Sequence, residues 1–211
     1  MKQAKPAATG LQLRRRPKQE RSRERIDAIL ATAKRLIGEK GIDAVTMKEV
    51  GAQAGGPIAT VYHYFPNKSA ILATLYERFS EVTRARQLEI TASIDGLESM
   101  VTASDKMLDD YYDRVAGDPA IQDLQNAIQA DKALQNLDIA ETHQQAKIFC
   151  DKVAYLLKPQ RREEFRRMVF LFFQLAGGVV RLALTQDKAQ GQQTVDDYKS
   201  VIHGQLRTFF D

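Results

Sequence analysis

Residues 54–68 read AGGPIATVYHYFPNK, and the order of residues in this stretch is unusual for a helix that packs into a protein core. A core helix spaces its apolar and aromatic residues three and four apart. Here consecutive aromatic and imidazole rings occupy positions 62–65, directly after a Gly-Gly-Pro break. Gly55–Gly56 predicts a tight turn, and Pro57 predicts the first turn of a short helix, where its missing N–H does no harm.

Two further helices are predicted before this break. Thr46 with Glu49 three residues later is a capping box, which predicts a short helix that ends near Ala54. Gly41 is expected to terminate the preceding helix, because glycine is the preferred residue just beyond a helix C-terminus. That helix is predicted from Arg25 onwards by apolar residues at helical spacing, namely Ile26, Ile29, Leu30, Ala33, Leu36 and Ile37.

Three short helices with a glycine turn between the second and the third are the layout of a helix-turn-helix. In the third helix, Val61 and Phe65 lie four apart and are expected to face the core. The remaining side chains carry hydroxyl groups and an imidazole, which suit phosphates and base edges. The alternative, aromatic packing against the rest of the protein, accounts for one tyrosine but not for the whole set, which is Thr60, Tyr62, His63 and Tyr64.

The segment from Arg23 to Phe79 resembles the DNA-binding domain of the tetracycline-repressor (TetR-type) family. The chain keeps that family's residues at Ala54–Gly55, Thr60, Tyr62, Tyr64–Phe65 and Lys68, and departs from them at Gly56 (usually Val), Pro57 (often Ser), Ala59 (often Gly) and Ser69 (often Glu). The resemblance implies a DNA-binding domain over 23–81. The predicted DNA contacts are Thr46, Pro57, Ile58, Ala59, Thr60, Tyr62, His63, Tyr64 and Lys68.

Positive charge is concentrated at the N-terminus. Residues 1–25 contain nine Lys or Arg and two Glu, a net charge of +7, whereas the whole chain carries +4. Such an arm suits a polyanion, although a solvated leader would have the same composition. We expect a basic, flexible arm over 1–22 that strengthens DNA binding, mainly through Arg14, Arg15, Arg16 and Arg21.

The composition favours a protein of the cytoplasm. The single Cys150 excludes an intramolecular disulfide framework and fits a reducing compartment, and no apolar stretch near the N-terminus predicts a secretion signal. The longest apolar run, 168–184, contains Gln174 and Arg181 and is short for a membrane span. Burial in a protein interior or in a subunit interface explains this run better, so no membrane partner is expected.

After residue 82 the helical period continues without strand signals, which predicts an all-α protein with a larger second domain over 82–211. Within this domain one helix is expected from Ile139 to Leu157, and Pro159 is expected to open a long helix. Broad apolar faces on two C-terminal helices, with Gly177–Gly178 allowing close approach, favour a subunit interface over purely intrachain packing. The TetR-type resemblance implies a homodimer through these helices, with the recognition helices about 34–36 Å apart. The predicted interface residues are Met168, Phe172, Leu175, Gly178, Val179, Ile202, Leu206 and Phe209.

No pattern predicts an enzyme, a cofactor or a metal site. His63, His143 and His203 are too far apart in sequence for helical ligand spacing, and no phosphate-binding loop, nucleophile elbow or dinucleotide motif is present. The resemblance implies a small-molecule effector held by the middle helices of the larger domain. Polar or aromatic residues beside apolar stripes are the candidates, although each also suits ordinary packing: Tyr111, Arg114, His143, Phe149, Phe173 and Gln174.

The sequence therefore predicts a DNA-binding transcriptional regulator. The resemblance implies a repressor that binds a palindromic operator in double-stranded DNA as a dimer and is released by an unidentified small molecule. The alternative is a DNA-binding protein without small-molecule control.

Overall fold

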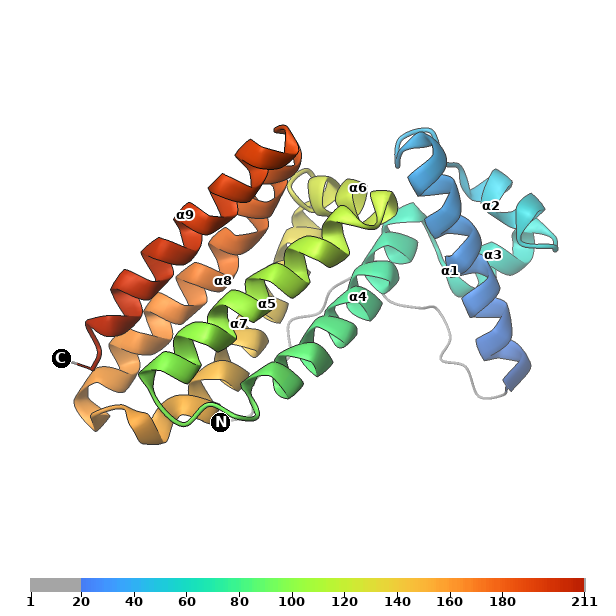
Figure 1. The fold of residues 1–211 in the computed structure, drawn as a ribbon. Coiled ribbons are helices and arrows are strands. Elements are labelled where there is room, and N and C mark those ends of the chain that lie inside the picture. Colours follow the sequence, from blue (N-terminus) through green and yellow to red (C-terminus); the bar gives the residue numbers. More distant parts are fainter. Residues whose placement is uncertain (1–19, 211) are drawn as a thin grey trace. The chain divides into compact units, whose positions relative to one another are not determined.

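The computed structural model describes residues 20–210, which form helices joined by short loops with no strand among them (Figure 1). The predicted all-α class is confirmed. The N-terminal helices are α1 (Glu20–Lys40), α2 (Met47–Gln53), α3 (Ile58–Tyr64) and α4 (Lys68–Thr91). They are followed by α5 (Leu97–Ala116), α6 (Pro119–Ile128), α7 (Lys132–Val153), the 3₁₀ turns η1 (Ala154–Leu156) and η2 (Pro159–Arg161), α8 (Arg162–Leu184) and α9 (Lys188–Arg207).

The chain forms two compact units, each built from two segments. The first unit runs to Phe79 and includes Pro119–Leu137, and the second comprises Ser80–Asp118 and the chain from Asp138 onwards. Both α4 and α7 are therefore divided between the units. The helix-turn-helix shares its compact unit with α6, which the sequence assigned to the larger domain. The predicted domain division, 1–22, 23–81 and 82–211, remains a prediction.

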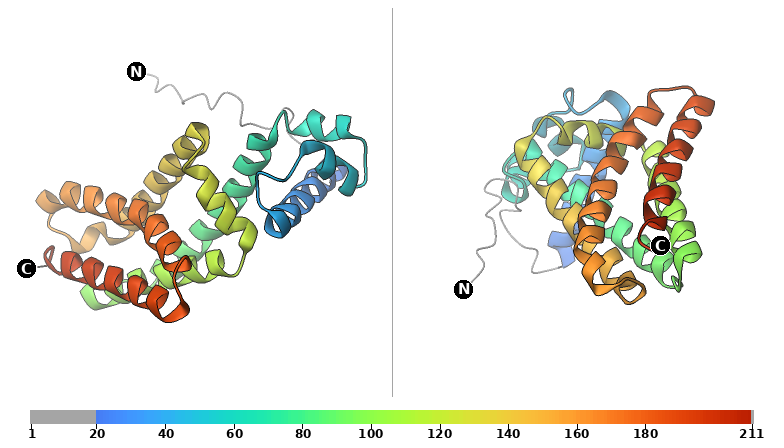
Figure 2. Two further views of the ribbon diagram at one scale, coloured as in Figure 1. Left: turned by 90° about the horizontal axis from the view of Figure 1, so that it is seen from above. Right: turned by 90° about the vertical axis from the view of Figure 1, so that its left-hand side faces the viewer.

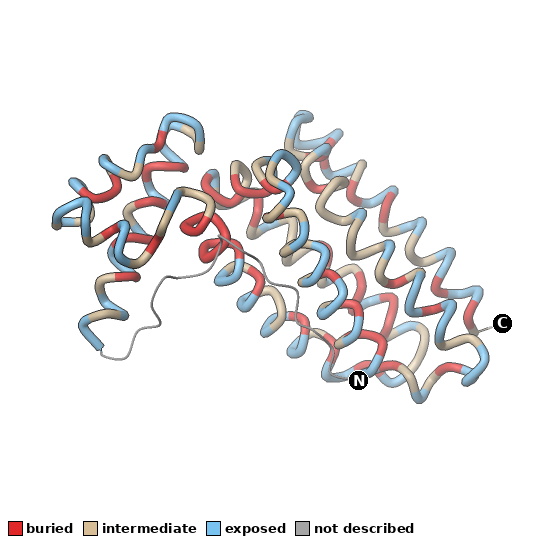
Figure 3. Tube along the Cα trace, turned by 180° about the vertical axis from the view of Figure 1, so that it is seen from behind, coloured by how far each residue is buried: buried red, intermediate tan, exposed pale blue. Residues whose placement is uncertain are grey.

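In the first unit, α1 packs against α2 and α6, and α2 packs against α3. All six residues of the apolar stripe predicted for α1, the first of which is Ile26 and the last Ile37, are buried (Figure 3). Gly41 ends this helix with a positive φ of 81°, which an L-residue with a side chain adopts reluctantly. α1 starts at Glu20, earlier than the predicted Arg25, so Arg21 of the predicted arm is helical.

The first unit also contains the start of α7, which the sequence analysis placed too late. A helix was predicted from Ile139, whereas α7 begins at Lys132. Asp131 caps it, because its carboxylate accepts from the backbone N–H groups of Ala133 and Leu134 at 2.8 and 3.2 Å. An Asp before an amphipathic stretch is a helix-start signal that was available in the sequence.

In the second unit, α8 and α9 run side by side and both pack against α5 (Figure 2). Aromatic rings form the centre of this core: the Phe165 ring lies 6.3 Å from that of Phe149 and 5.1 Å from that of Phe209. The predicted opening of a long helix at Pro159 corresponds to the turn η2, after which α8 continues. α9 begins at Lys188 because the Asp187 carboxylate accepts from two backbone N–H groups of its first turn.

Candidate functional site

The turn of the helix-turn-helix depends on Gly55 and on a distant arginine. Gly55 has a φ of 74°, which completes the reversal after α2. The Arg25 guanidinium, from α1, donates through Nη1 to the carbonyl of Ala54, the C-cap residue of α2. A cation at a helix C-terminus is favourable, because the last carbonyl groups have no partner within the helix. Arg25 therefore fixes the end of α2 from outside the motif.

The recognition helix α3 divides its side chains as predicted between core and surface. Val61 and Phe65 have no exposed surface. On the other side, Tyr62 is 41% exposed and Ile58 is 38% exposed. The exposed set also contains Pro57, Ala59 and His63, whereas Thr60 and Tyr64 are partly buried, with the Tyr64 ring edge-on to His63 at 5.0 Å.

Two predicted contacts next to α3 also have structural roles. Thr46 is the exposed N-cap of α2 and accepts from the Glu49 N–H at 3.2 Å, which confirms the predicted cap. The Lys68 ammonium donates to the carbonyl oxygens of Ile42 and Val45 at 2.8 and 3.4 Å. Lys68 therefore ties the loop before α2 to the start of α4, and only its remaining N–H is available for a phosphate.

Of the predicted arm residues, only Arg21 lies within the residues that the structure describes. Arg14, Arg15 and Arg16 lie outside the described residues. Arg21 is exposed in the first turns of α1. Lys48, in the first turn of α2, is also exposed and forms no ion pair with residues 20–210. The sequence analysis missed Lys48, although its position two residues after the Thr46 cap marks it as a neighbour of the predicted phosphate contacts.

α8 carries an apolar face that residues 20–210 leave exposed. Leu171, Leu175 and Leu182 are 52%, 46% and 53% exposed and recur at helical spacing. Pro159–Leu184 is long and apolar enough to cross a membrane, by length and composition only, and 17% of its most apolar window is buried. Among the other predicted interface residues, Met168, Phe172, Gly178, Val179 and Ile202 are partly buried.

Two of the predicted interface residues belong to the core of their own chain. Leu206 and Phe209 are 2% and 3% exposed and pack in the cluster around Phe165. They have almost no surface left for a partner, because α9 turns this side towards α5 and α8. The apolar period of α9 identified a buried face but could not distinguish intrachain from intersubunit burial.

The presence of glycine at positions 177 and 178 can be explained by contacts within α8 and α5, which the sequence did not predict. A Cβ atom on Gly177 would lie 3.4 Å from Arg181 Nη1 and 3.6 Å from the Tyr111 hydroxyl oxygen. A Cβ atom on Gly178 would lie 3.8 Å from Arg181 Nη2. The Arg181 side chain therefore folds back along α8 over both glycines, where the missing side chains leave room for its guanidinium.

The predicted effector residues of α5 lie in a polar part of the second unit. Burial, and then the charge of Asp138, raise the pKa of Tyr111 above its usual range. Burial lowers the pKa of Arg114, whose guanidinium pairs with Asp110 at 2.9 Å and donates to the Thr83 hydroxyl at 2.8 Å. Tyr111 is therefore held as a neutral phenol, while the Arg114 guanidinium is already committed to side chains of α4 and α5.

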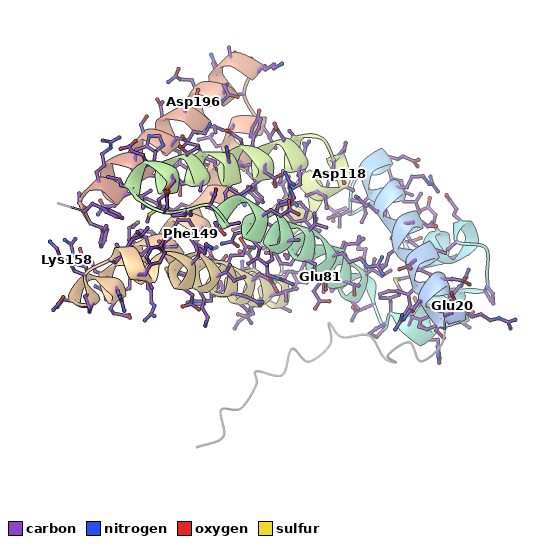
Figure 4. All side chains as sticks on the ribbon, turned by 60° about the horizontal axis from the view of Figure 1, so that its bottom comes forward. Glu20, Glu81, Asp118, Phe149, Lys158 and Asp196 are labelled. Atoms are coloured by element: carbon purple, nitrogen blue, oxygen red, sulfur yellow. The ribbon has the colours of Figure 1, made fainter. Side chains whose placement is uncertain are left out.

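The remaining predicted effector residues belong to α7 and α8. Phe149 of α7 is labelled in Figure 4. Phe149 is 2% exposed, and its ring lies 6.2 Å from that of Phe173. Gln174 donates from Nε2 to Asp138 at 3.1 Å. His143 is exposed and stacks on the Phe170 ring at 4.1 Å. The structure thus brings Phe149 and Phe173 into contact. It also places Asp138 near both Gln174 and Tyr111, whereas His143 lies at the surface.

Residues 20–210 contain no group of three or more His, Cys, Asp and Glu side chains placed to hold a metal ion. Cys150 is 4% exposed, and burial raises the pKa of its thiol to about 12. A thiolate is therefore disfavoured, and Cys150 acts as a small apolar core residue.

Comparison with known proteins identifies the family. Residues 29–75 match a family model described as bacterial regulatory proteins, tetR family, and residues 98–210 match the tetracyclin repressor-like C-terminal domain. The second match spans more than half of the chain. The chain belongs to the TetR family. It is a DNA-binding transcriptional regulator with a helix-turn-helix domain followed by a helical C-terminal domain, and dimers and repressors are typical of this family.

Solved structures of TetR-family proteins share the fold. A TetR-family regulator from Streptomyces coelicolor aligns with a TM-score of 0.67 at 21% identity, covering 90% of this chain and 99% of that one. SmeT in complex with triclosan aligns with a TM-score of 0.62 at 15% identity, covering 84% and 91%. A regulator from Saccharomonospora viridis in complex with choline aligns with a TM-score of 0.58 at 18% identity, covering 83% of this chain and 95% of that one. No curated protein sequence matches the chain.

Two of the four departures from the common TetR pattern, Gly56 and Ser69, have structural explanations. A Cβ atom on Gly56 would lie 3.0 Å from Cζ of Arg25 and still closer to its Nη2, so the usual valine and this guanidinium compete for one space. Ser69 donates to Asp131 at 3.2 Å, where the usual glutamate would meet a like charge. The sequence analysis missed Arg25 because its partner Ala54 lies 29 residues away, too far for any local pattern.

Proposed function

We propose that this TetR-family regulator is a cytoplasmic repressor that binds a palindromic operator as a homodimer and leaves it when a small molecule binds. One observation carries the proposal: a two-turn helix, α3, is anchored by two fully buried residues and turns polar side chains outwards. A helix presented in this way fits the major groove, where base edges carry a distinct pattern of donors and acceptors.

Within α3, the proposal separates sequence readout from positioning. Thr60 and His63 are placed nearest the base edges, with Tyr62 on the phosphate backbone. The other proposed contacts, with phosphates, sugars or thymine methyl groups, are made by Thr46, Pro57, Ile58, Ala59, Tyr64 and Lys68. Lys48 joins the phosphate contacts because its exposed ammonium follows the Thr46 cap directly.

The test is footprinting and gel-shift titration on the DNA that flanks the protein's own gene. A defined, symmetric footprint is expected. His63→Ala should change which bases matter, by about 1–3 kcal/mol for each lost base contact, whereas Tyr62→Phe should weaken binding to all sequences alike. Tyr155→Phe is the matched control, because Tyr155 is an exposed tyrosine of the second unit. Operator affinity unchanged in both α3 variants would refute the assignment, and protein that coats DNA without a footprint would support unregulated binding instead.

For dimerisation, the exposed stripe of α8 is the proposed surface. Leu171, Leu175 and Leu182 form an exposed apolar stripe that a second copy of α8 and α9 would bury, and α9 adds Val201, which is 59% exposed. Met168, Phe172, Gly178, Val179 and Ile202 complete the proposed interface. A dimer accounts for this face better than lipid does, because the helix starts with the charged residues Glu163, Glu164, Arg166 and Arg167.

A charge introduced into that stripe tests the interface. Leu175→Glu should convert the dimer to monomers in analytical ultracentrifugation, because a carboxylate buried without a partner is strongly unfavourable. Leu88→Glu is the matched control, because Leu88 of α4 is 57% exposed but lies on neither α8 nor α9. Equal dimer affinity in the two variants would contradict the proposal.

The basic arm is proposed to add affinity without selecting sequence. Each lost phosphate contact reduces the slope of log affinity against log salt by about 0.9. Deletion of residues 1–18 removes six cations and no acidic residue, so the slope should flatten while the footprint remains in place. A truncated protein with the full-length slope would show that the arm is a bystander.

Control by a small molecule is supported by the polar and aromatic interior of the second unit and by complexes of proteins with this fold. Those structures carry triclosan and choline, which are different ligands, so they support an effector site without naming the effector. The proposed residues are Tyr111, Arg114, His143, Phe149, Phe173 and Gln174, and catalysis is not part of the proposal. A thermal-shift screen should find stabilising compounds that also lower operator affinity, with a coupling of about 1–3 kcal/mol. If none of the stabilising compounds changes DNA binding, effector control is wrong.

A further inference from the structure

Two glutamines, each with a buried side-chain amide oxygen, flank one helix of the second unit. Gln87 of α4 is 3% exposed and donates from Nε2 to the backbone carbonyl of Gln145 at 2.8 Å. Gln174 of α8 donates from Nε2 to Asp138 Oδ2 at 3.1 Å. Both acceptors belong to α7. Because a carbonyl or carboxylate oxygen can only accept, these bonds fix which end of each amide is NH₂ and direct each Oε1 elsewhere.

Both amide oxygens are buried and accept no hydrogen bond from any residue between 20 and 210. A buried acceptor without a partner destabilises the folded protein, so two of them in one interior are strongly unfavourable. Asp138 and Gln145 are seven residues apart on α7, which places them on the same face and about 10 Å apart along its axis. The two unused oxygens therefore flank a single face of α7.

A buried threonine lies between these positions, and a buried phenylalanine lies beyond them. Thr142 is 7% exposed and Phe149 is 2% exposed, and both share the face of Asp138 and Gln145 at helical spacing. The Phe149 ring contacts that of Phe173 edge-on. This surface suits an aromatic body, while the unused groups beside it are hydrogen-bond acceptors.

We infer that the effector is an elongated apolar or aromatic molecule with a hydrogen-bond donor, hydroxyl or N–H, near each end, and that Gln87 and Gln174 accept from these donors. The inference rests on the proposed effector site and names its ligand class. Ligands whose polar end can only accept, such as carboxylates, are disfavoured by both glutamines. Arg181 does not reverse this preference, because it is only partly buried and solvent can satisfy its charge.

The experiment compares two probes that differ only in their donors. Binding of 4,4′-dihydroxybiphenyl and of its dimethyl ether is measured by calorimetry on the full chain without DNA. The diol should bind, and the ether should bind at least tenfold more weakly. Gln87→Met and Gln174→Met should each weaken diol binding roughly threefold to tenfold, the range for one lost hydrogen bond. Gln144→Met is the matched control, because Gln144 is exposed on α7.

Thermal unfolding without probe checks that the variants fold. The melting temperature should change little, because each methionine removes both the unpartnered oxygen and the Nε2 hydrogen bond to α7, and the two losses act in opposite directions. An ether that binds as well as the diol overturns the inference, and so does a difference between the probes that persists in both methionine variants. If a variant does not fold, the comparison of the two probes on the unaltered chain decides. A diol that binds as expected but leaves operator affinity unchanged supports the proposed binding site. That outcome contradicts only the separate proposal that the effector releases the protein from its operator.

Discussion

The chain contains two glycine pairs, Gly55–Gly56 and Gly177–Gly178, and both lie under an arginine, but for different reasons. At the first pair the backbone itself requires glycine, because Gly55 has a positive φ of 74°. At the second pair the backbone is ordinary helix, and what glycine supplies is space for the Arg181 guanidinium. The same dipeptide thus serves backbone conformation in the DNA-binding unit and side-chain packing in α8.

This difference separates two causes of destabilisation that a sequence pattern cannot distinguish. A Cβ atom on Gly55 would have no neighbour within 4 Å, yet the positive φ penalises any side chain. Around Gly177 the backbone accepts any residue, and only the neighbouring side chains oppose one. Substitutions at the two pairs should therefore respond to different compensating changes.

The largest effect is expected for Gly55→Val. A β-branched residue at this φ should cost about 2–3 kcal/mol of unfolding free energy and abolish operator binding, because the end of α2 and the start of α3 shift together. Denaturant unfolding and gel-shift titration measure both effects. Gly55→Asn is the matched control, since asparagine tolerates the left-handed region, and it should retain most of the stability. Equal losses in both variants would show that the turn does not depend on this conformation.

Gly178→Leu should have the next largest effect, about 1–2 kcal/mol, because the larger side chain displaces Arg181 and widens any contact with a second copy of α8. The double variant with Arg181→Ala separates the two causes. If the guanidinium is the only obstacle, the double variant regains stability and dimer affinity in ultracentrifugation. If a partner helix also lies over Gly178, dimer affinity stays low.

The sequence predicted the fold wherever a local pattern carried the information. The stripe of α1, the Thr46 cap and the break at Gly55 are local, and each was located correctly. Features that join distant segments were not predicted: Arg25 on Ala54 and Ser69 on Asp131. The position of Arg181 over its own glycines was also missed, although these residues are neighbours on α8. The face of Leu206 and Phe209 was recognised as buried but assigned to the wrong partner, because periodicity reports burial and not what covers it.

For the proposed DNA contacts, the residue types were predictable but their surroundings were not. Thr60, Tyr62, His63 and Tyr64 were predicted to face outwards; Tyr62 and His63 are exposed, whereas Thr60 and Tyr64 are partly buried. The hydrogen bonds of Lys68 to two loop carbonyls depend on how α4 meets the loop before α2, and no residue pattern contains that information. The same holds for Gln87 and Gln174, whose neighbours on α7 are far away in sequence.

The arginine of the first pair should show coupling to its glycine. Arg25→Met removes the charge at the end of α2 and should cost about 1 kcal/mol. Gly56→Val, the usual TetR residue, should cost a similar amount alone, because it expels the guanidinium from Ala54. In the Arg25→Met background the valine should cost little, so a double-mutant cycle should give a coupling of about 0.5–1 kcal/mol. Strict additivity would show that valine and the guanidinium do not share this space.

The smallest change in unfolding free energy is expected for Gly177→Ala, because two opposing effects nearly cancel. Alanine is favoured over glycine inside a helix by about 0.5–1 kcal/mol, whereas its methyl group would lie 3.4 Å from Arg181 Nη1 and 3.6 Å from the Tyr111 hydroxyl oxygen. Both contacts are with the ends of side chains, which can shift by a few tenths of an ångström. The net change in unfolding free energy should therefore lie within about 0.5 kcal/mol of zero. Gly55→Ala has far more space but the wrong backbone conformation, so it should destabilise by about 1 kcal/mol. Chemical denaturation of the two alanine variants side by side measures this contrast, and the reverse order of stability would mean that space, and not conformation, selects glycine at the turn.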